Sequence, residues 1–561
     1  MLRKKLLSLS LAAALILGCA ACKKQEETTL TSRAPVTSTT TTEAPAASSL
    51  EETASSLEET TSSEETTSSD ETPASTSENS ETSETSETGT SSETSPDKKV
   101  PNARNNMPKD YGSGKQDEFS AELLKLDRVI GAELLATSRD NDKLKKYFVI
   151  FEMPLDWEHP ERGTFPLRTT FTYVSDKVSN VFTCDGYNLS DYVIASDFIF
   201  PDWYSIEANQ ISCEHRFFGS SVPEGLSSDS LDYWDCLTDE NAAADFHHII
   251  EQFKTFLTGK WIFTGGSKGG QLTHMQSHFY PDDADLYFSF VAPGGVSQDA
   301  PDFFDFIYNE IGNDKYGEAT AKIHREEMLQ FQVEAMKLKD KLAPRYYQLG
   351  LDSGCKFTDF TTPEILYDMA VLDSATITWQ YNQDFFEVKR ILDEKGSATF
   401  EDDVFNYLVI MNEPSVWSNN DELFAYYVQA ARQNGEHEYD FSFLREALRK
   451  EGLENLLTVT EDMEKGLLFK MVFTPEQLEA FTFDPTVYND MVEWSHTTKS
   501  QVIMVYGGAD VWYSVRLPDV DDNENIHRYV AKKDSHMASL IGLEQSERDE
   551  ITALMKKAMG I

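Results

Sequence analysis

Residues 265–270, with the sequence GGSKGG, have the residue types of a catalytic turn. Their Gly-x-Ser-x-Gly pattern directly follows a short apolar run, residues 261–264, and directly precedes a stretch with helical character, residues 271–279. In a nucleophile elbow the serine lies on a tight turn between a strand and a helix, and glycines accommodate its strained backbone and close neighbours. We therefore predict that Ser267 is a nucleophile. The alternative is a glycine-rich turn with an idle serine.

A serine hydroxyl needs a histidine that takes its proton and an acid that orients this histidine. In proteins with such an elbow, the three residues occur along the chain in the order serine, acid, histidine. We predict Asp510, in the loop after the apolar run 501–506, as the acid, because sites of open sheets lie at the carboxyl ends of strands. We predict His536, in the loop after residues 525–531, as the base; the alternative is a surface loop histidine. The residues weighed against these two are His496, His527, Asp519, Asp521, Asp522 and Asp534.

An elbow of this kind also predicts two backbone donors for an oxyanion hole. One is the N–H of Lys268, which follows the nucleophile at the N-terminus of the predicted helix. The other is the N–H of Tyr187, in the loop after a strand that ends at Cys184, where Gly186 permits a close approach. An ordinary turn is the alternative for this loop.

The flanking sequence predicts the sheet that must position these residues. Residues 147–153 and 164–174 predict an antiparallel hairpin around a turn at 160–163. Further strands are predicted at 178–184, 209–213, 261–264, 286–291, 501–506 and 525–531, and helices at 241–258, 271–279 and 544–559. Strands that alternate with helices indicate a mostly parallel sheet, so the predicted class is α/β, with the α/β-hydrolase fold.

A different pattern interrupts this alternation. From residue 301 to residue 495 the sequence has long amphipathic stretches, such as 319–342 and 422–433, which predict helices. We therefore predict an inserted helical cap over residues 301–495. It divides the hydrolase core into a first part, residues 116–300, and a second part, residues 496–561.

The N-terminus has the pattern of an export signal. A basic start precedes an apolar run, residues 6–17, which is shorter than the roughly 20 residues that span a bilayer. The sequence ILGC, ending at Cys19, resembles a bacterial lipobox. We predict a lipoprotein signal peptide over residues 1–22, with Cys19 lipidated and Cys22 as the second candidate, and hence a protein anchored by lipid on the outer face of the cell membrane. The alternative is a cleaved, freely secreted protein.

A stalk is predicted over residues 23–115. From residue 23 to about residue 99 the chain is almost wholly Thr, Ser, Glu, Ala and Pro and lacks aromatic residues. Such a composition cannot bury a core and is typical of disorder.

Charge and cysteine spacing limit the partners. The 561 residues carry a formal net charge of −47, which repels nucleic acid and anionic head groups, so neither is an expected partner. Beyond the N-terminal pair Cys19 and Cys22, no CxxC or His-Cys metal spacing is found, and no metal or cofactor is expected. Outside the N-terminal pair the cysteines are Cys184, Cys213, Cys236 and Cys355. Four free thiols and one disulfide bond are both left open.

Several blocks resemble a known peptidase family. Residues 213–223, CEHRFFGSSVP, look like the E-H-R-F-F-G-x-S-x-P block shared by two serine-peptidase families with Pro-directed activity. Besides the Ser267 block, further matching blocks lie at 163–165, 183–187, 208–210, 242–247, 279–283, 291–293 and 379–381. Together they resemble the secreted bacterial prolyl tri/tetrapeptidyl aminopeptidases, the thirty-seventh family of serine peptidases, over about residues 146–536.

This resemblance implies an α/β-hydrolase with a helical cap that removes tri- or tetrapeptides from free N-termini, often after proline. It places the triad on Ser267, Asp510 and His536, in agreement with the reasoning from the residues. Two positions depart from the family pattern, because Val511 stands where proline is common and Cys184 replaces a usual acidic residue. The long stalk is also foreign to the pattern. These departures bear on proline preference and product length.

Within the shared block, Glu214 would explain exopeptidase action, because a carboxylate near the catalytic centre can pair with the α-ammonium of a substrate. The alternative is a structural ion pair with Arg216 or His215. Trp379 and Tyr381 are predicted to wall the substrate pocket, with plain core packing in the cap as the alternative.

The sequence thus predicts a cell-surface serine exopeptidase that acts on peptides. One alternative is a Pro-directed carboxypeptidase or dipeptidyl peptidase of the sister family, or an esterase. Another is a non-catalytic surface-binding lipoprotein on an inactive hydrolase scaffold.

Overall fold

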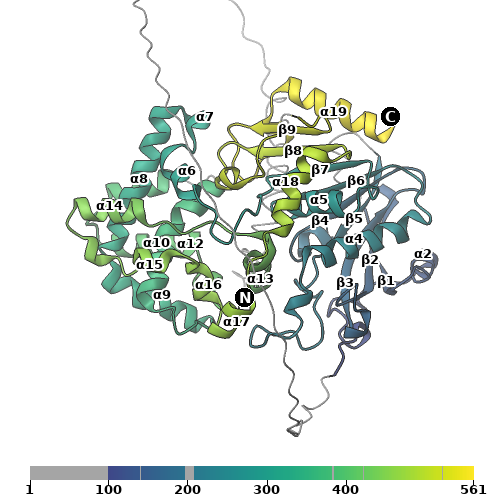
Figure 1. Cartoon of the computed structure of the whole chain (residues 1–561), viewed down its shortest axis with the longest axis horizontal. Helices are drawn as coiled ribbons and strands as arrows, with labels where there is room; N and C mark the ends of the chain where they lie inside the picture. The colour runs from purple at the N-terminus through teal and green to yellow at the C-terminus, as the bar shows by residue number, and fades with distance from the viewer. Residues whose placement is uncertain (1–98, 139–140, 196–206, 382–384, 421, 521) are drawn as a thin grey trace, which may run out of the picture. The chain divides into compact units, whose positions relative to one another are not determined.

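The computed structural model describes residues 99–138, 141–195, 207–381, 385–420, 422–520 and 522–561 (Figure 1). The predicted signal peptide, Cys19, Cys22 and residues 23–98 of the predicted stalk lie outside these residues. In the described ranges, no helix combines the length and the apolar character needed to cross a membrane.

One mixed sheet forms the framework. Within the described residues its nine strands lie in the order β1-β2-β3-β5-β4-β6-β7-β8-β9. From β1 to β9 their bounds are Val129–Ser138, Asn141–Pro154, Thr164–Tyr173, Ser179–Cys184, Ala208–Cys213, Trp261–Gly266, Leu286–Phe290, Val502–Gly507 and Ile526–Ala531. β1, β2, β3 and β5 pair antiparallel, and all pairs from β5 through β4 to β9 are parallel. This order, with β4 and β5 exchanged, is that of the α/β-hydrolase fold and confirms the predicted class.

Both faces of the sheet are covered, because side chains alternate between them. On β8, Val502 and Met504 belong to the core that includes side chains of α4 and α5, whereas Ile503 and Val505 pack with α19. These helices are Asp239–Lys254, Lys268–Phe279 and Gln545–Met559. The buried strands and the helices between them therefore correspond to the predicted alternation.

The opening hairpin is confirmed, since β2 and β3 pair antiparallel around the 3-10 turn Pro160–Arg162. The strand β1, which the sequence pattern does not predict, pairs with the outer edge of β2. Register irregularities between Val129 and Gly131 and between Leu134 and Ala136 disturb its alternation of side chains. A strand of this kind lacks the period of two on which the prediction depends.

Residues 100–115, assigned to the stalk by the sequence analysis, instead pack on the hydrolase core. Ala103 is fully buried, and its N–H donates to Thr164 Oγ1 (2.9 Å). Asp110 forms an ion pair with Arg168 of β3 (2.8 Å). The core therefore begins earlier than the predicted boundary at residue 116, because this segment carries apolar and pairing residues that the Ser/Thr/Glu-rich run lacks.

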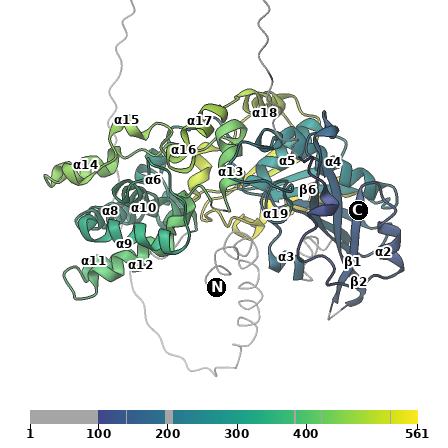
Figure 2. The same ribbon diagram turned by 90° about the horizontal axis from the view of Figure 1, so that it is seen from below.

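A helical cap is inserted in the sequence between β7 and β8, and it lies to one side of the sheet (Figures 1 and 2). From α6 to α18 its helices are Phe303–Asn309, Asn313–Tyr316, Glu318–Met336, Lys339–Asp352, Pro363–Gln380, Phe385–Asp393, Phe400–Met411, Phe424–Gln429, Ser442–Lys450, Glu461–Glu464, Leu467–Val472, Pro475–Ala480 and Thr486–Thr497. The predicted helix 319–342 is divided into α8 and α9. The last helix, α18, stacks Trp494 on His274 of α5 (5.5 Å between ring centroids), so it packs on the core although it falls within the predicted cap.

Candidate active site

Ser267 occupies the turn between β6 and α5. Its φ of 55° and ψ of −126° lie in a region that L-residues rarely adopt, as a nucleophile elbow requires. Its N–H donates to the carbonyl of Phe290 (2.9 Å), and its carbonyl accepts from the N–H of Gln271 (3.0 Å). A Cβ at Gly265 would lie 2.3 Å from the carbonyl oxygen of Gly269, so the turn needs glycine there. The surrounding backbone thus holds the strained serine in place.

Ser267, His536 and Asp510 form one hydrogen-bonded chain. Nε2 of His536 lies 2.9 Å from Ser267 Oγ, and Nδ1 of His536 lies 2.8 Å from Asp510 Oδ2. Because an ionised carboxylate only accepts, Nδ1 carries the proton and Nε2 faces the serine hydroxyl as an acceptor. Asp510 and His536 are buried. The structure therefore brings the three predicted residues together in the geometry that general-base catalysis requires.

The loops after β8 and β9 position the two partners of the serine. Asp510 Oδ1 accepts from the N–H of Trp512 (3.1 Å), so one oxygen fixes its own loop while the other orients His536. A Cβ at Gly507 would lie 2.2 Å from the carbonyl oxygen of Ser535. Glycine at this position therefore lets the loop that carries the acid approach the loop that carries the histidine.

The loop after β4 closely approaches the elbow. Gly186 has a φ of +75°, and a Cβ on it would lie 2.6 Å from the backbone nitrogen of Gly269. Among the described residues, the N–H groups of Tyr187 and Lys268 donate to no other protein group. The two predicted oxyanion donors thus lie on adjoining backbone segments, with their hydrogen-bonding capacity unused.

The side chain of Lys268 has a role that the sequence analysis missed. It is buried, its Nζ donates to the carbonyl of Gly186 (2.7 Å), and its ammonium lies 4.8 Å from the ring centroid of Phe218. Burial lowers the pKa of Lys268 to about 7, against the opposing charge of Asp239. The carbonyl that it binds belongs to the same peptide unit as the N–H of Tyr187, so this contact restricts the orientation of that donor. A lysine among the glycines of the elbow was the available signal.

Glu214 does not offer its carboxylate to a substrate, which corrects the prediction for this residue. Its exposed fraction is 0%, and Arg168 donates to both oxygens, with 2.7 Å between Nε and Oε2. Ser221 Oγ (2.5 Å) and the N–H of Leu189 (2.9 Å) also donate to it. Burial raises the pKa of Glu214, and Arg168 opposes this shift. The structural ion pair is therefore formed, with Arg168 as the partner.

The residues that were weighed as partners of Glu214 have other contacts. Arg216 is fully buried and binds both carboxylate oxygens of Asp245, on α4, at 2.8 Å. Nδ1 of His215 lies 2.8 Å from the carbonyl oxygen of Arg216, and burial lowers the pKa of His215 well below its ordinary value. The side chains of the EHR sequence therefore tie the end of β5 to its neighbours.

The two predicted pocket residues are separated by the structure. Tyr381, at the end of α10, has its ring centroid 6.4 Å from that of His536. The backbone N–H of His536 donates to the carbonyl of Gln380 (2.9 Å). Trp379 is 1% exposed and packs against Phe385 of α11 at 4.4 Å between ring centroids. Of these two residues, Tyr381, which follows the last residue of α10, therefore lies beside the triad, whereas Trp379, in the last turn of α10, is a core residue of the cap.

No disulfide joins any of the four cysteines in the described part of the chain, which are Cys184, Cys213, Cys236 and Cys355. Burial raises the pKa of Cys184 and that of Cys236 to about 12. In the described part of the chain the four cysteines are therefore free thiols, which is one of the two possibilities left open by the sequence. Cys184 and Cys236 have no thiolate character at neutral pH.

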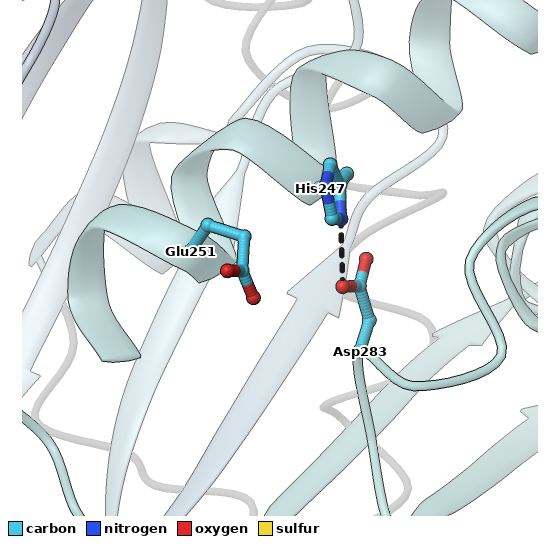
Figure 3. A group of neighbouring side chains, drawn as sticks. All are labelled: His247, Glu251 and Asp283. Carbon is cyan, nitrogen blue, oxygen red and sulfur yellow. Dashed lines mark hydrogen bonds and ion pairs between the residues drawn. The ribbon is translucent and has the colours of Figure 1, made fainter. Parts of the chain in front are cut away.

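A second group of polar side chains lies at His247, Glu251 and Asp283 (Figure 3). Its atoms are close enough to hold a cation, but Asp283 already has partners, since His247 Nδ1 lies 2.8 Å from Oδ1 and Gln276 donates to Oδ2 (2.6 Å). Lys254 Nζ lies 3.1 Å from Glu251 and 3.8 Å from Asp283. Lys254 offsets part of the negative charge of this cluster, and the contacts of Asp283 tie α4 to the loop after α5.

The fold and the site geometry define a serine hydrolase of the α/β type. The family described as PS-10 peptidase S37 matches residues 127–561, so the chain belongs to this family of serine peptidases. It is thus a serine peptidase, as the sequence predicted.

Known proteins that resemble the chain include a prolyl tri/tetrapeptidyl aminopeptidase of Streptomyces mobaraensis. It is 25% identical over 421 residues, which cover 74% of this chain and 80% of that protein. Solved structures include a proline iminopeptidase of Mycobacterium smegmatis, at 9% identity and a TM-score of 0.29 over 76% of this chain and 98% of that one. A peroxisomal α/β-hydrolase of Saccharomyces cerevisiae has 10% identity and a TM-score of 0.30 over 74% and 90%. The fold is assigned from the strand order of the sheet and not from the similarity to these two structures.

Proposed function

We propose that this serine peptidase is an exopeptidase that releases short peptides from free N-termini, with Ser267 as its nucleophile. The observation that carries the catalytic part is the hydrogen-bonded chain from Asp510 through His536 to Ser267 on a strained elbow. The name of the Streptomyces mobaraensis relative supports tri- and tetrapeptides as products and proline before the cut bond.

The triad geometry supports an acyl-enzyme mechanism. His536 Nε2 takes the proton of Ser267 Oγ as this oxygen bonds to the carbonyl carbon of the peptide, and Asp510 stabilises the imidazolium that forms. When the C–N bond breaks, His536 returns the proton to the leaving amine. Water then attacks the ester, with His536 taking its proton and giving it back to Ser267 Oγ as the released peptide acid departs.

The oxyanion of each tetrahedral intermediate would lie between the N–H groups of Tyr187 and Lys268. A preorganised donor of this kind typically contributes a factor of about 10² to 10³ to kcat. The side chain of Lys268 supports this role by holding the Gly186 carbonyl of the same loop (2.7 Å).

We also place the protein at the outer face of the cell membrane, anchored by lipid at Cys19, or at Cys22 as the second candidate. The lipobox-like ILGC sequence supports this anchor, and the low-complexity run up to residue 98 would act as a spacer. Replacing both cysteines by alanine should move the protein from the membrane fraction into the medium; continued membrane fractionation would contradict the anchor.

Digestion of a defined peptide library, with products identified by mass, tests the proposed activity. The proposal expects products of three or four residues that originate at free N-termini. Products from the C-terminus would indicate a carboxypeptidase, dipeptides a dipeptidyl peptidase, and hydrolysis of esters alone an esterase. Absence of any hydrolysis and of fluorophosphonate labelling would favour a non-catalytic binding protein.

A further inference from the structure

A second glutamate, Glu436, is buried on the cap side of the site. Its side chain is 4% exposed. Its N–H donates to the carbonyl of Ser297 and its carbonyl accepts from the N–H of Ala300, both at 2.8 Å, so it is held against the loop that follows β7. It comes two residues after the π-helical turn Ala430–Asn434, an irregularity that often occurs near functional sites.

Two contacts connect this segment with the candidate active site. Nε2 of Gln271, in the first turn of α5, donates to the carbonyl of Asn434 (3.2 Å). The hydroxyl of Tyr426 donates to the carboxylate of Glu436, and the ring centroid of Tyr426 lies 6.0 Å from that of Tyr187. A pair of tyrosine rings therefore connects the Glu436 carboxylate to the oxyanion loop.

The carboxylate of Glu436 keeps a capacity for hydrogen bonds that Glu214 lacks. Among the described residues, Oε2 accepts from Tyr426 and Oε1 accepts from the N–H of His437 (3.1 Å). An ionised carboxylate offers roughly four acceptor positions, so about two stay open. Glu214, in contrast, accepts two bonds from Arg168 and one each from a serine hydroxyl and a backbone N–H.

Within the described ranges no Lys or Arg forms an ion pair with Glu436. Nε2 of His437 lies 3.5 Å from it, but Nδ1 of this ring donates to the carbonyl of Glu438 (2.9 Å). Burial lowers the pKa of His437 to about 4, so the ring is neutral. Burial raises the pKa of Glu436 to about 7, and the charges of Asp373 and Asp299 add to this shift. A buried carboxylate in such surroundings favours a cationic ligand.

Asp185, in the oxyanion loop, is the competing acid. Its Oδ2 has no hydrogen-bond partner among the described residues. Burial raises its pKa to about 7, but Lys146 and Arg168 lie close enough to oppose this shift. These two cations partly compensate the charge of Asp185, whereas Glu436 has no such compensation.

We propose that Glu436 binds the α-ammonium of the peptide substrate and thereby fixes the distance from the chain end to the cut bond. This inference rests on the proposed exopeptidase function and transfers to Glu436 the role predicted for Glu214. An ammonium has three donors for the open acceptor positions, and the rings of Tyr187 and Tyr426 can add cation–π attraction. An extended tripeptide spans roughly 10 Å, so its terminus is expected away from the triad.

The test compares Glu436→Gln with the matched control Glu438→Gln in the full-length protein. The substrate is the coumarin amide of a tripeptide that ends in proline, with a free or an acetylated N-terminus. Wild type should prefer the free form in kcat/KM. Glu436→Gln should reduce this preference on the order of 10- to 150-fold, the value of a charge-assisted hydrogen bond, whereas Glu438→Gln should keep it. Glu436→Asp, with its charge on a shorter side chain, should lie between.

Thermal unfolding and fluorophosphonate labelling verify that each variant is folded. A preference that survives in Glu436→Gln overturns the inference and leaves the proposed function intact. A preference that is lost in Asp185→Asn instead also overturns it, because the ammonium would then bind at the oxyanion loop. If wild type shows no preference, both the proposed function and the inference fail. If Glu436→Gln does not fold, an unchanged preference in Glu436→Asp overturns the inference.

Discussion

The sheet and the cap both carry buried acids near the site, but the partners of these acids differ. In the loops that follow strands of the sheet, Asp510 bonds to His536 and Glu214 bonds to Arg168. In the cap, neutral groups donate to Glu436. A buried acid that is paired with a base is committed to that partner, Asp510 to orienting the histidine of the triad and Glu214 to holding the framework, because loss of either partner leaves an uncompensated charge. A buried acid without a base can receive a cationic ligand, so the donors around a carboxylate, more than its burial, indicate its role.

The largest effect is expected for Asp510→Asn. The substitution should leave the fold intact and lower kcat by about 10⁴, because the amide favours the wrong tautomer of His536. Steady-state kinetics on a free-amine peptide measures this loss. Asp519→Asn is the matched control, since Asp519 lies in the same connection and pairs with Arg516 at the surface (2.8 Å). Normal turnover by Asp510→Asn, or a loss of turnover only in Asp519→Asn, would show that Asp510 is not the acid of the triad.

The next largest effect is expected when the buried ion pair between Glu214 and Arg168 is separated. Arg168→Met should lower the free energy of unfolding by about 3–5 kcal/mol, because it leaves the buried Glu214 without a cation. Glu214→Gln should lower it less, because Arg168 keeps its ion pair with Asp110. Urea unfolding measures these losses, and the double variant should recover a large part of them. The preference of the folded fraction for free N-termini should be retained. A stable Glu214→Gln that loses this preference would return the ammonium-binding role to Glu214.

A smaller effect is expected for Lys268→Met, which keeps the backbone N–H but loses the contact with Gly186. We expect kcat to fall about 10- to 100-fold with little change in KM. A less restricted Tyr187 N–H stabilises the oxyanion of the transition state less well, whereas binding of the substrate in the ground state does not depend on it. Stopped-flow acylation rates with an ester substrate would measure the step directly. A change in KM alone would show that the lysine acts on substrate binding.

The smallest effect is a dependence on pH that sharpens the role of the cap. Because the pKa of Glu436 is raised to about 7, its carboxyl gains a proton and loses its charge as the pH falls through this value. The preference for free over acetylated peptide should therefore fall by up to about tenfold per pH unit below 7, and again above about 8, where the substrate amine loses its proton. The ratio of the two substrates cancels groups that act on both. A ratio that stays flat below pH 7 would contradict the assignment.

The triad could be predicted because its constraints are local. Ser267 lies between glycines directly after an apolar strand, and the strand at 501–506 and the strand at 525–531 each end shortly before Asp510 and His536. The structure places Ser267, His536 and Asp510 within hydrogen-bonding distance, in the expected order. The hairpin, the alternation of strands and helices, and the inserted cap were predictable for the same reason, since each repeats a short period in the sequence.

The partners of the other residues could not be predicted, because they depend on distant contacts. Arg168 lies 46 residues before Glu214, and only the pairing of β3 with β5 brings them together. Trp379 lies in the last turn of α10 and Tyr381 directly follows this helix, and the packing of the helix in the cap decides which of them faces the site. No motif marks Glu436, whose character depends on the absence of a neighbouring cation among the described residues.

The role of Ser267 as the nucleophile can be tested by labelling the full-length protein with a fluorophosphonate, followed by proteolytic mapping and mass spectrometry. We expect one adduct on Ser267, its loss in Ser267→Ala, and a fall in kcat of about 10⁴ to 10⁶ in that variant. An adduct on another residue, or normal peptide turnover by Ser267→Ala, would contradict the account.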